Sequence, residues 1–173
     1  DGGFVVVWRG SSQNSGIYGQ RYNKFGELSG NEFRVTEGQG IPLVTNLSDG
    51  GFVVTWTDYS EIYIQIYDSS GAKFGDKFQI NTGTAVGYSS PAVTSHFDGG
   101  FILTWQADGP EGFYTGIYGQ RFDKVGSVVG EEFNVNSDIL GDKTHPSVTH
   151  LSDGMFIVTW QVYRDLNYEG IYG

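Results

Sequence analysis

The sequence predicts an all-β protein made of tandem four-stranded antiparallel meanders, stacked like the blades of a β-propeller. The main observation is one eight-residue phrase that occurs four times, ending at Trp8, Trp56, Trp105 and Trp160. These tryptophans are 48, 49 and 55 residues apart, and a fixed period of that size indicates a repeat architecture. The 27 glycines, the 16% of aromatic residues and the lack of helical periodicity favour glycine-punctuated strands over helices.

The third copy shows how the first half of a unit is built. A short run from 91 to 97 opens with proline, which the first residue of a strand tolerates. Asp98-Gly99-Gly100 then predicts a tight turn, because glycine supplies the positive φ that hairpin turns need. The strand from 101 to 105 is apolar on both faces, so we expect both of its faces to be covered.

The second half of the same unit completes the meander. Residues 116–122 predict a third strand, and Asp123-Lys124-Val125-Gly126 predicts another turn. Residues 131–136 alternate polar and apolar, which is typical of a half-exposed strand. A buried interior and a more solvent-exposed outer strand are typical of a propeller blade, which is stable only when it packs on neighbouring blades. We therefore expect the tryptophans to pack between blades.

We assign residues 1–173 to one domain with units at about 1–41, 42–90, 91–145 and 146–173. The first and last units are incomplete, which indicates a piece of a longer protein, and a ring closed by this chain alone is not expected. Further repeats or neighbouring copies of the chain would supply the missing edges. A β-trefoil is the alternative fold, but it needs three complete units, whereas this chain carries parts of four.

Charge and composition exclude several classes of partner. Twenty Asp and Glu against ten Lys and Arg give a net charge of −10, which repels a nucleic-acid backbone. Cysteine is absent, so neither disulfides nor thiolate metal sites hold the fold together. No apolar run is long enough to predict membrane insertion. The acidic balance suits an extracellular or cell-surface protein, with further repeats, other copies of itself or glycans as partners.

A candidate ligand site lies in the longer, more variable loops. In a meander these loops gather at one end of each blade, where binding sites often lie. Aromatic rings beside acids and amides suit stacking on sugars, although the same rings could simply cover blade edges. The aromatic candidates are Tyr59, Phe113, Tyr114, Tyr163 and Tyr168.

Two other short patterns indicate sites. Asp165, Asn167 and Glu169 place oxygen donors at alternate positions, like part of a calcium loop, but they lack its glycine and its later glutamate. A solvated turn is the alternative, and calcium is the only cofactor that the sequence suggests. Asn46 opens the triplet Asn-Leu-Ser, an N-glycosylation signal if the protein is secreted by a eukaryote.

The sequence gives no motif for catalysis. His96, His145 and His150 are the only histidines, and no cysteine or nucleophile motif accompanies them. Glu131 and Glu132 are adjacent on a strand, so they point to opposite faces and cannot flank one bond. We therefore predict that the protein is not an enzyme and assign no catalytic residue.

Three phrases carry a resemblance to a known kind of repeat. Residues 49–56, 116–123 and 130–136 resemble tandem repeats of very large secreted surface proteins of bacteria and protists. The resemblance implies a β-propeller-like extracellular region of adhesins or fibre-forming coats, often beside calcium-binding or glycan-related modules, and carries over no catalytic residue. The sequence departs from the pattern at Ile64 and Ile66, which replace a Gly-Arg pair, and at Met155, which replaces a glycine.

The function expected from these patterns is structural. We predict a non-enzymatic, adhesive extracellular repeat protein that assembles into filaments or a surface coat through its incomplete end repeats. The alternative is a lectin-like module that binds glycan on the face formed by the variable loops.

Overall fold

The computed structural model describes residues 2–11, 15–80, 87–109, 114–136, 140–164 and 167–173. In this part of the chain, 14 strands form four separate antiparallel sheets, and the strands within each sheet follow one another in chain order. The first sheet consists of β1 (Phe4–Arg9), β2 (Ile17–Tyr22) and β3 (Phe33–Thr36). The second consists of β4 (Pro42–Asn46), β5 (Phe52–Asp58), β6 (Glu61–Tyr67) and β7 (Lys73–Gln79).

The remaining strands repeat the same pattern. The third sheet consists of β8 (Ser89–Ser95), β9 (Phe101–Asp108), β10 (Thr115–Phe122) and β11 (Val128–Asn134). The fourth consists of β12 (Asp142–His150), β13 (Phe156–Arg164) and β14 (Asn167–Tyr172). The predicted all-β fold of propeller-like meander blades is confirmed. No helix that could span a membrane is found among the described residues.

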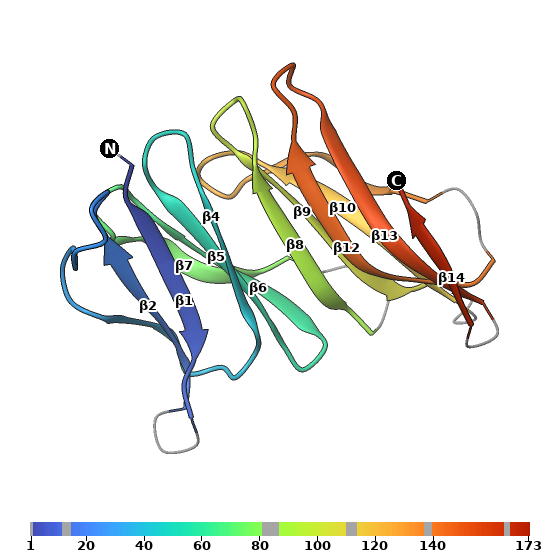
Figure 1. The fold of residues 1–173 in the computed structure, drawn as a ribbon, viewed down its shortest axis with the longest axis horizontal. Coiled ribbons are helices and arrows are strands. Elements are labelled where there is room, and N and C mark those ends of the chain that lie inside the picture. The colour runs from blue at the N-terminus through green and yellow to red at the C-terminus, as the bar shows by residue number, and fades with distance from the viewer. Residues whose placement is uncertain (1, 12–14, 81–86, 110–113, 137–139, 165–166) are drawn as a thin grey trace.

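The four sheets follow one another in an open row. Figure 1 shows the first sheet at one end of the longest axis and the fourth sheet at the other. The inner edges of neighbouring sheets adjoin, because β4 lies against β1 and β8, and β12 lies against β8. The outer strands β3, β7 and β11 are therefore the ones that face away from the inner edge of the row.

Apolar clusters fill the spaces between neighbouring sheets. Trp56 is fully buried against Ile17 and Val35 of the first sheet, and Trp105 is buried against Ile62 of the second. Trp160 is half-buried against the cluster that joins the third and fourth sheets. Trp8, in the first sheet, is also half-buried, and its ring stacks on Tyr18 with centroids 6.4 Å apart.

A buried glutamine recurs in the third strand position of three units. Gln65 sits where the pairing of β6 with β7 shifts register, and its Nε2 donates to the carbonyls of Ile66 and Gly75, both at 3.1 Å. Gly75 has φ 67°, a backbone conformation that glycine adopts without steric cost. The glutamine therefore satisfies two carbonyls that the bulge removes from the ladder. The counterparts of Gln65 are Gln20, which donates to Arg21 and Gly30, and Gln120, which donates to Arg121 and Gly130.

We predict that Gln65→Ala lowers the free energy of unfolding by about 2 kcal/mol, measured by urea denaturation. The substitution leaves two carbonyls without their donor and opens a small cavity, and an unsatisfied buried polar group costs about 1–3 kcal/mol. Glu131→Ala, an exposed strand position, is the control and should change stability by less than about 0.5 kcal/mol. Equal stability of the two variants would show that the glutamine does not support the bulge.

The repeated acids are explained by the turns that they close. Oδ1 of Asp49 accepts the N–H of Gly51 at 3.0 Å, and Oδ1 of Asp98 accepts the N–H of Gly100 at 3.0 Å. Asp98 is further bound, because His96 Nδ1 and Arg121 Nη2 each lie 2.8 Å from its oxygens. The acids that follow the third strand make similar turns, with Asp68 Oδ1 accepting the N–H groups of residues 70 and 72.

These contacts set the protonation of Asp98. Partial burial acts to raise the pKa of its carboxyl, but the hydrogen bonds from His96, Gly100 and Arg121 outweigh burial and lower it. The folded state therefore releases this proton more readily than the unfolded state does. The resulting stabilisation is complete above the ordinary value of about 3.9 and is lost as the pH falls through the lowered pKa.

We predict that Asp98→Asn is less stable than the wild type at pH 7 and that the difference shrinks below about pH 4. The loss should not exceed about 1 kcal/mol, because the Asp98 side chain is 38% exposed and solvent screens its ion pair. Thermal denaturation between pH 2 and pH 8 measures both curves. Asp153→Asn, which disturbs only a turn hydrogen bond, is the matched control. Parallel curves for wild type and Asp98→Asn would refute this assignment.

Candidate functional site

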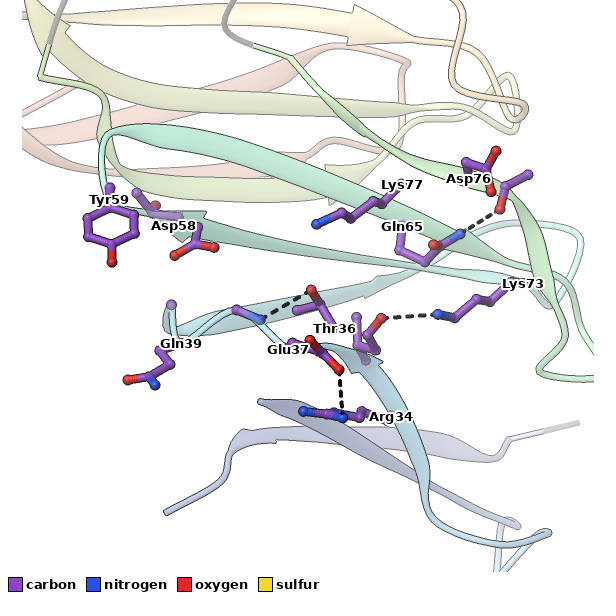
Figure 2. A pocket seen from close by; sticks show the side chains of 15 residues that line it. Arg34, Thr36, Glu37, Gln39, Asp58, Tyr59, Gln65, Lys73, Asp76 and Lys77 are labelled. Atoms are coloured by element: carbon purple, nitrogen blue, oxygen red, sulfur yellow. Dashed lines mark hydrogen bonds and ion pairs between the residues drawn. The ribbon is translucent and has the colours of Figure 1, made fainter. Parts of the chain in front are cut away.

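A groove of about 1210 Å³ lies between the first and second sheets. One wall is β3 with the loop 37–40, and the other is the end of β5 together with β6 and β7 (Figure 2). The bulge at Gln65 and Gly75 is part of the second wall. The groove is thus assembled from two consecutive units, and its lining is mainly polar.

Two basic side chains of the groove have bonded partners, and one of them, Lys73, links the two walls. Lys73 on β7 donates from Nζ to the carbonyl of Val35 on β3 at 3.1 Å, which ties the two sheets together at this point. Arg34 forms an ion pair with Glu37, with Nη1 and Oε1 3.2 Å apart. Nη2 of Arg34 also donates to the carbonyl of Ser15 at 2.8 Å, so the arginine has partners on both sides within the first unit.

Three carboxylates line the groove and come from both walls: Glu37, Asp58 and Asp76. In Figure 2, Asp58 and Asp76 lie toward opposite ends of the groove. The loop that carries Glu37 passes close to Asp58, because a Cβ placed on Gly38 would lie 2.9 Å from Asp58 Oδ2. Glycine at position 38 therefore leaves room for the Asp58 side chain beside this loop.

Tyr59 adopts a strained conformation at that mouth. Asp58 pairs with Glu61, so Tyr59 lies in a two-residue hairpin turn, with φ 56° and a side chain that is 99% exposed. A bulky residue with positive φ is uncommon, and glycine would fill this position at lower cost. Such strain is found most often at functional sites. The exposed ring gains nothing from packing, which favours a role in binding.

A second aromatic residue, Tyr63, lies beside the groove on β6. Lys77 places Nζ 4.9 Å from the centre of the Tyr63 ring, and the hydroxyl donates to Glu61. This hydrogen bond to a carboxylate, together with partial burial, raises the pKa of the tyrosine. Lys77 of the groove and its neighbour Glu61 therefore both contact the Tyr63 side chain.

The structure separates most of the aromatic residues that were predicted to bind a ligand. Tyr163 and Tyr168 do meet, with ring centroids 5.6 Å apart in an edge-on contact. Tyr59 belongs to the second sheet and the other two to the fourth, with the third sheet between them (Figure 1). Tyr114 is exposed just before β10, and Phe113 lies outside the described residues.

The predicted calcium and glycosylation sites are only partly described. Glu169 lies 3.5 Å from the Nε of Arg164, so its carboxylate already has a cationic neighbour. Asn167 begins β14, and Asp165 lies outside the described residues. Across the described ranges, no group of three or more histidine or carboxylate side chains could hold a metal ion. Asn46 is exposed at the end of β4. Calcium binding and glycosylation stay predictions.

Sequence reasoning missed the charged lining of the groove. Glu37 belongs to the first unit and Asp58 to the second, 21 residues later, so no local motif joins them. The available signal was that Tyr59 directly follows an aspartate in a loop at the variable end of the blade. The packing of the first sheet on the second was needed to bring these residues together.

No family model matches the chain, and no curated protein matches it. The solved structures do give matches. An endo-arabinase from Bacteroides thetaiotaomicron aligns with a TM-score of 0.58 and 15% identity, over 99% of this chain and 70% of that one. An endo-1,4-beta-xylanase from the same organism aligns with a TM-score of 0.53 and 14% identity, over 92% of this chain and 65% of that one.

A glycoside hydrolase family 43 protein from Bacillus licheniformis also aligns, with a TM-score of 0.53 and 16% identity. The alignment covers 95% of this chain and 35% of that one. These neighbours are five-bladed β-propeller enzymes, and what the chain shares with them is the fold. The chain thus spans between about one third and seven tenths of their lengths.

This similarity contradicts the predicted non-enzymatic, adhesive repeat protein, together with its lectin-like alternative. The repeated phrases encode apolar strands and turns, and glycoside hydrolases have the same blade packing. The phrases therefore indicate the fold of the protein and not its function. The prediction that the protein is not an enzyme is contradicted as well. It rested on the lack of a nucleophile motif, whereas glycoside hydrolysis requires two carboxylates that can come from distant segments.

Proposed function

We propose that this chain is part of an enzyme that hydrolyses glycosidic bonds in a polysaccharide, and that the polysaccharide binds in the groove between the first and second sheets. The observation that carries the proposal is that Glu37 and Asp58, from different sheets, line one groove together with the exposed Tyr59. The fold shared with glycoside hydrolases supports it.

The chemistry requires one carboxylic acid and one carboxylate. The acid protonates the oxygen of the leaving sugar, while the carboxylate takes a proton from the attacking water or attacks the sugar carbon itself. We assign the carboxylate role to Glu37, which Arg34 holds at 3.2 Å, and the acid role to Asp58 on the opposite wall. When the carboxylate acts on water, Asp58 gives a proton to the oxygen of the leaving sugar, and Glu37 receives a proton from the attacking water.

The rest of the groove suits a sugar polymer. Sugar hydroxyls both donate and accept hydrogen bonds, and the lining offers the amide of Gln39, the carboxylate of Asp76 and the ammonium of Lys77. Tyr59 offers an aromatic face to the apolar side of a sugar ring. The lining extends from Tyr59 at one end to Lys73 and Asp76 on β7 at the other (Figure 2), and we expect a groove of about 1210 Å³ to hold several consecutive sugars.

We predict that the wild-type protein releases reducing ends from arabinan or xylan, and that Asp58→Asn and Glu37→Gln each lower kcat at least 100-fold. General acid–base catalysis contributes about 10²- to 10⁴-fold, which sets this expectation. Glu32→Gln removes an exposed carboxylate outside the groove and is the matched control. Circular dichroism confirms that each variant is folded.

Two results would overturn the proposal. One is a folded wild-type protein that neither cleaves nor binds any polysaccharide of a broad panel. The other is cleavage that survives in both Asp58→Asn and Glu37→Gln, which would place the reaction elsewhere in the protein.

We predict that Tyr59→Gly weakens polysaccharide binding about 5- to 10-fold without lowering the melting temperature. The lost ring contact is worth about 0.5–1.5 kcal/mol, and glycine relieves the positive φ that tyrosine tolerates poorly. Isothermal titration calorimetry with the polymer and a thermal melt measure the two effects. A lower melting temperature with unchanged binding would show that the ring has a structural role only.

A further inference from the structure

The charge of the groove differs from the charge of the chain as a whole. The chain has twenty acidic and ten basic residues, which gives it a net charge of −10. Three of the ten basic residues line the groove: Arg34, Lys73 and Lys77. A fourth, Arg9, donates from Nη1 to the carbonyl of Gln39 in the lining at 3.2 Å. Because three carboxylates also line the groove, its positive and negative side chains balance.

The proposed reaction makes this lining positive. Asp58 must carry a proton before it can give one to the leaving sugar, so it is uncharged in the state that reacts. Glu37 and Asp76 are then the charged carboxylates of the lining, against three cations. A substrate that enters the groove therefore meets one net positive charge on a chain that is strongly negative overall.

Lys77 is the cation of the groove that can accept an anionic partner. Arg34 already forms its ion pair with Glu37, and Lys73 donates to a backbone carbonyl on the opposite wall. None of the ion pairs found in the described part of the chain includes Lys77, and its side chain is exposed. An anionic group of a ligand can therefore pair with Lys77 without displacing a carboxylate of the protein.

Tyr63 sets the position of Lys77. The Nζ of Lys77 lies 4.9 Å from the centre of the Tyr63 ring, close enough for the ring to attract the ammonium. The pKa of Tyr63 is raised first by its hydrogen bond to Glu61, then by burial, and to a smaller extent by the charges of Glu61 and Asp58. Lys77 and Asp58 therefore both lie near the same ring. In Figure 2, Lys77 lies between Asp58 and Asp76 along the groove.

We propose that the groove is specific for a polysaccharide that carries carboxylate groups, such as uronic acid side groups, and that Lys77 binds one of these carboxylates. This inference rests on the function proposed above and names its class of substrate. A hydrogen bond between an ammonium and a carboxylate is stronger than one between neutral groups. Lys77 therefore distinguishes an acidic polymer from a neutral polymer with the same backbone, and is a residue that determines specificity.

The test compares two forms of one polymer: a xylan with glucuronic acid side groups, and the same xylan after reduction of its carboxyl groups to alcohols. Isothermal titration calorimetry measures binding, and released reducing ends measure cleavage. We expect the wild type to prefer the acidic form about 5- to 10-fold in affinity and in kcat/KM, between the effects of an exposed ion pair and of a charge-assisted hydrogen bond. The preference should shrink as sodium chloride rises from about 20 to 500 mM, because salt screens the charges.

Three variants locate the preference. Lys77→Gln removes the charge and keeps a hydrogen-bond donor, so we expect the ratio between the two polymers to fall to about 1. Lys77→Arg keeps the charge and can also contact an aromatic ring, so it should keep most of the preference. Lys124→Gln, which removes an exposed lysine outside the groove, is the matched control and should keep the wild-type ratio. Circular dichroism establishes that all three are folded.

The outcomes separate this inference from the function on which it rests. Equal binding and equal cleavage of the two polymers by the wild type would overturn the specificity for carboxylates and leave the hydrolase proposal standing. A preference for the acidic polymer that survives in Lys77→Gln would overturn the role of Lys77. Preferential binding of the acidic polymer without cleavage of either form would support the specificity of the groove and overturn the hydrolase proposal. A wild type that neither binds nor cleaves either form would overturn both.

Discussion

The face-to-face burial of neighbouring sheets is the interaction on which the rest of this structure depends. Each four-stranded meander has apolar side chains on both sides of its second strand, so no sheet can bury all of its apolar side chains by itself. Trp56 and Trp105 are fully buried only because the preceding sheet covers them, whereas Trp8 is half-buried at the end of the row. Fully burying one large apolar side chain contributes about 1.5–3 kcal/mol, and each interface collects several.

Polar side chains solve the problems that this packing creates. The strands of each sheet must turn sharply and the outer strand must bend, which removes backbone groups from the ladder. Asp49 and Asp98 accept the free N–H groups of the first turn, and Gln65 donates to the carbonyls released by the bulge. Because Gln65 and Gly75 also line the groove, the same bulge that shapes the blade shapes one wall of the candidate site.

The candidate site is a product of the contact between units and not of any single unit. Arg34 and Glu37 come from the first unit, and Asp58 and Tyr59 from the second. A repeat protein can thus keep its packing residues constant while the loops at one end vary and acquire chemistry. This separation explains why the repeated phrases, which encode strands and turns, led by themselves to the wrong class of function.

Local residue types decided what could be predicted from the sequence. The four tryptophan phrases, the glycine turns and the alternation within strands determined the all-β meander, because turn chemistry and strand periodicity act over a few residues. The placement of Glu37 and Asp58 in one groove and the separation of Tyr59 from Tyr163 depend on how one sheet lies on the next. Only the tertiary structure decided them, since the distance between side chains from different units is set by packing across an interface and not by their spacing along the chain.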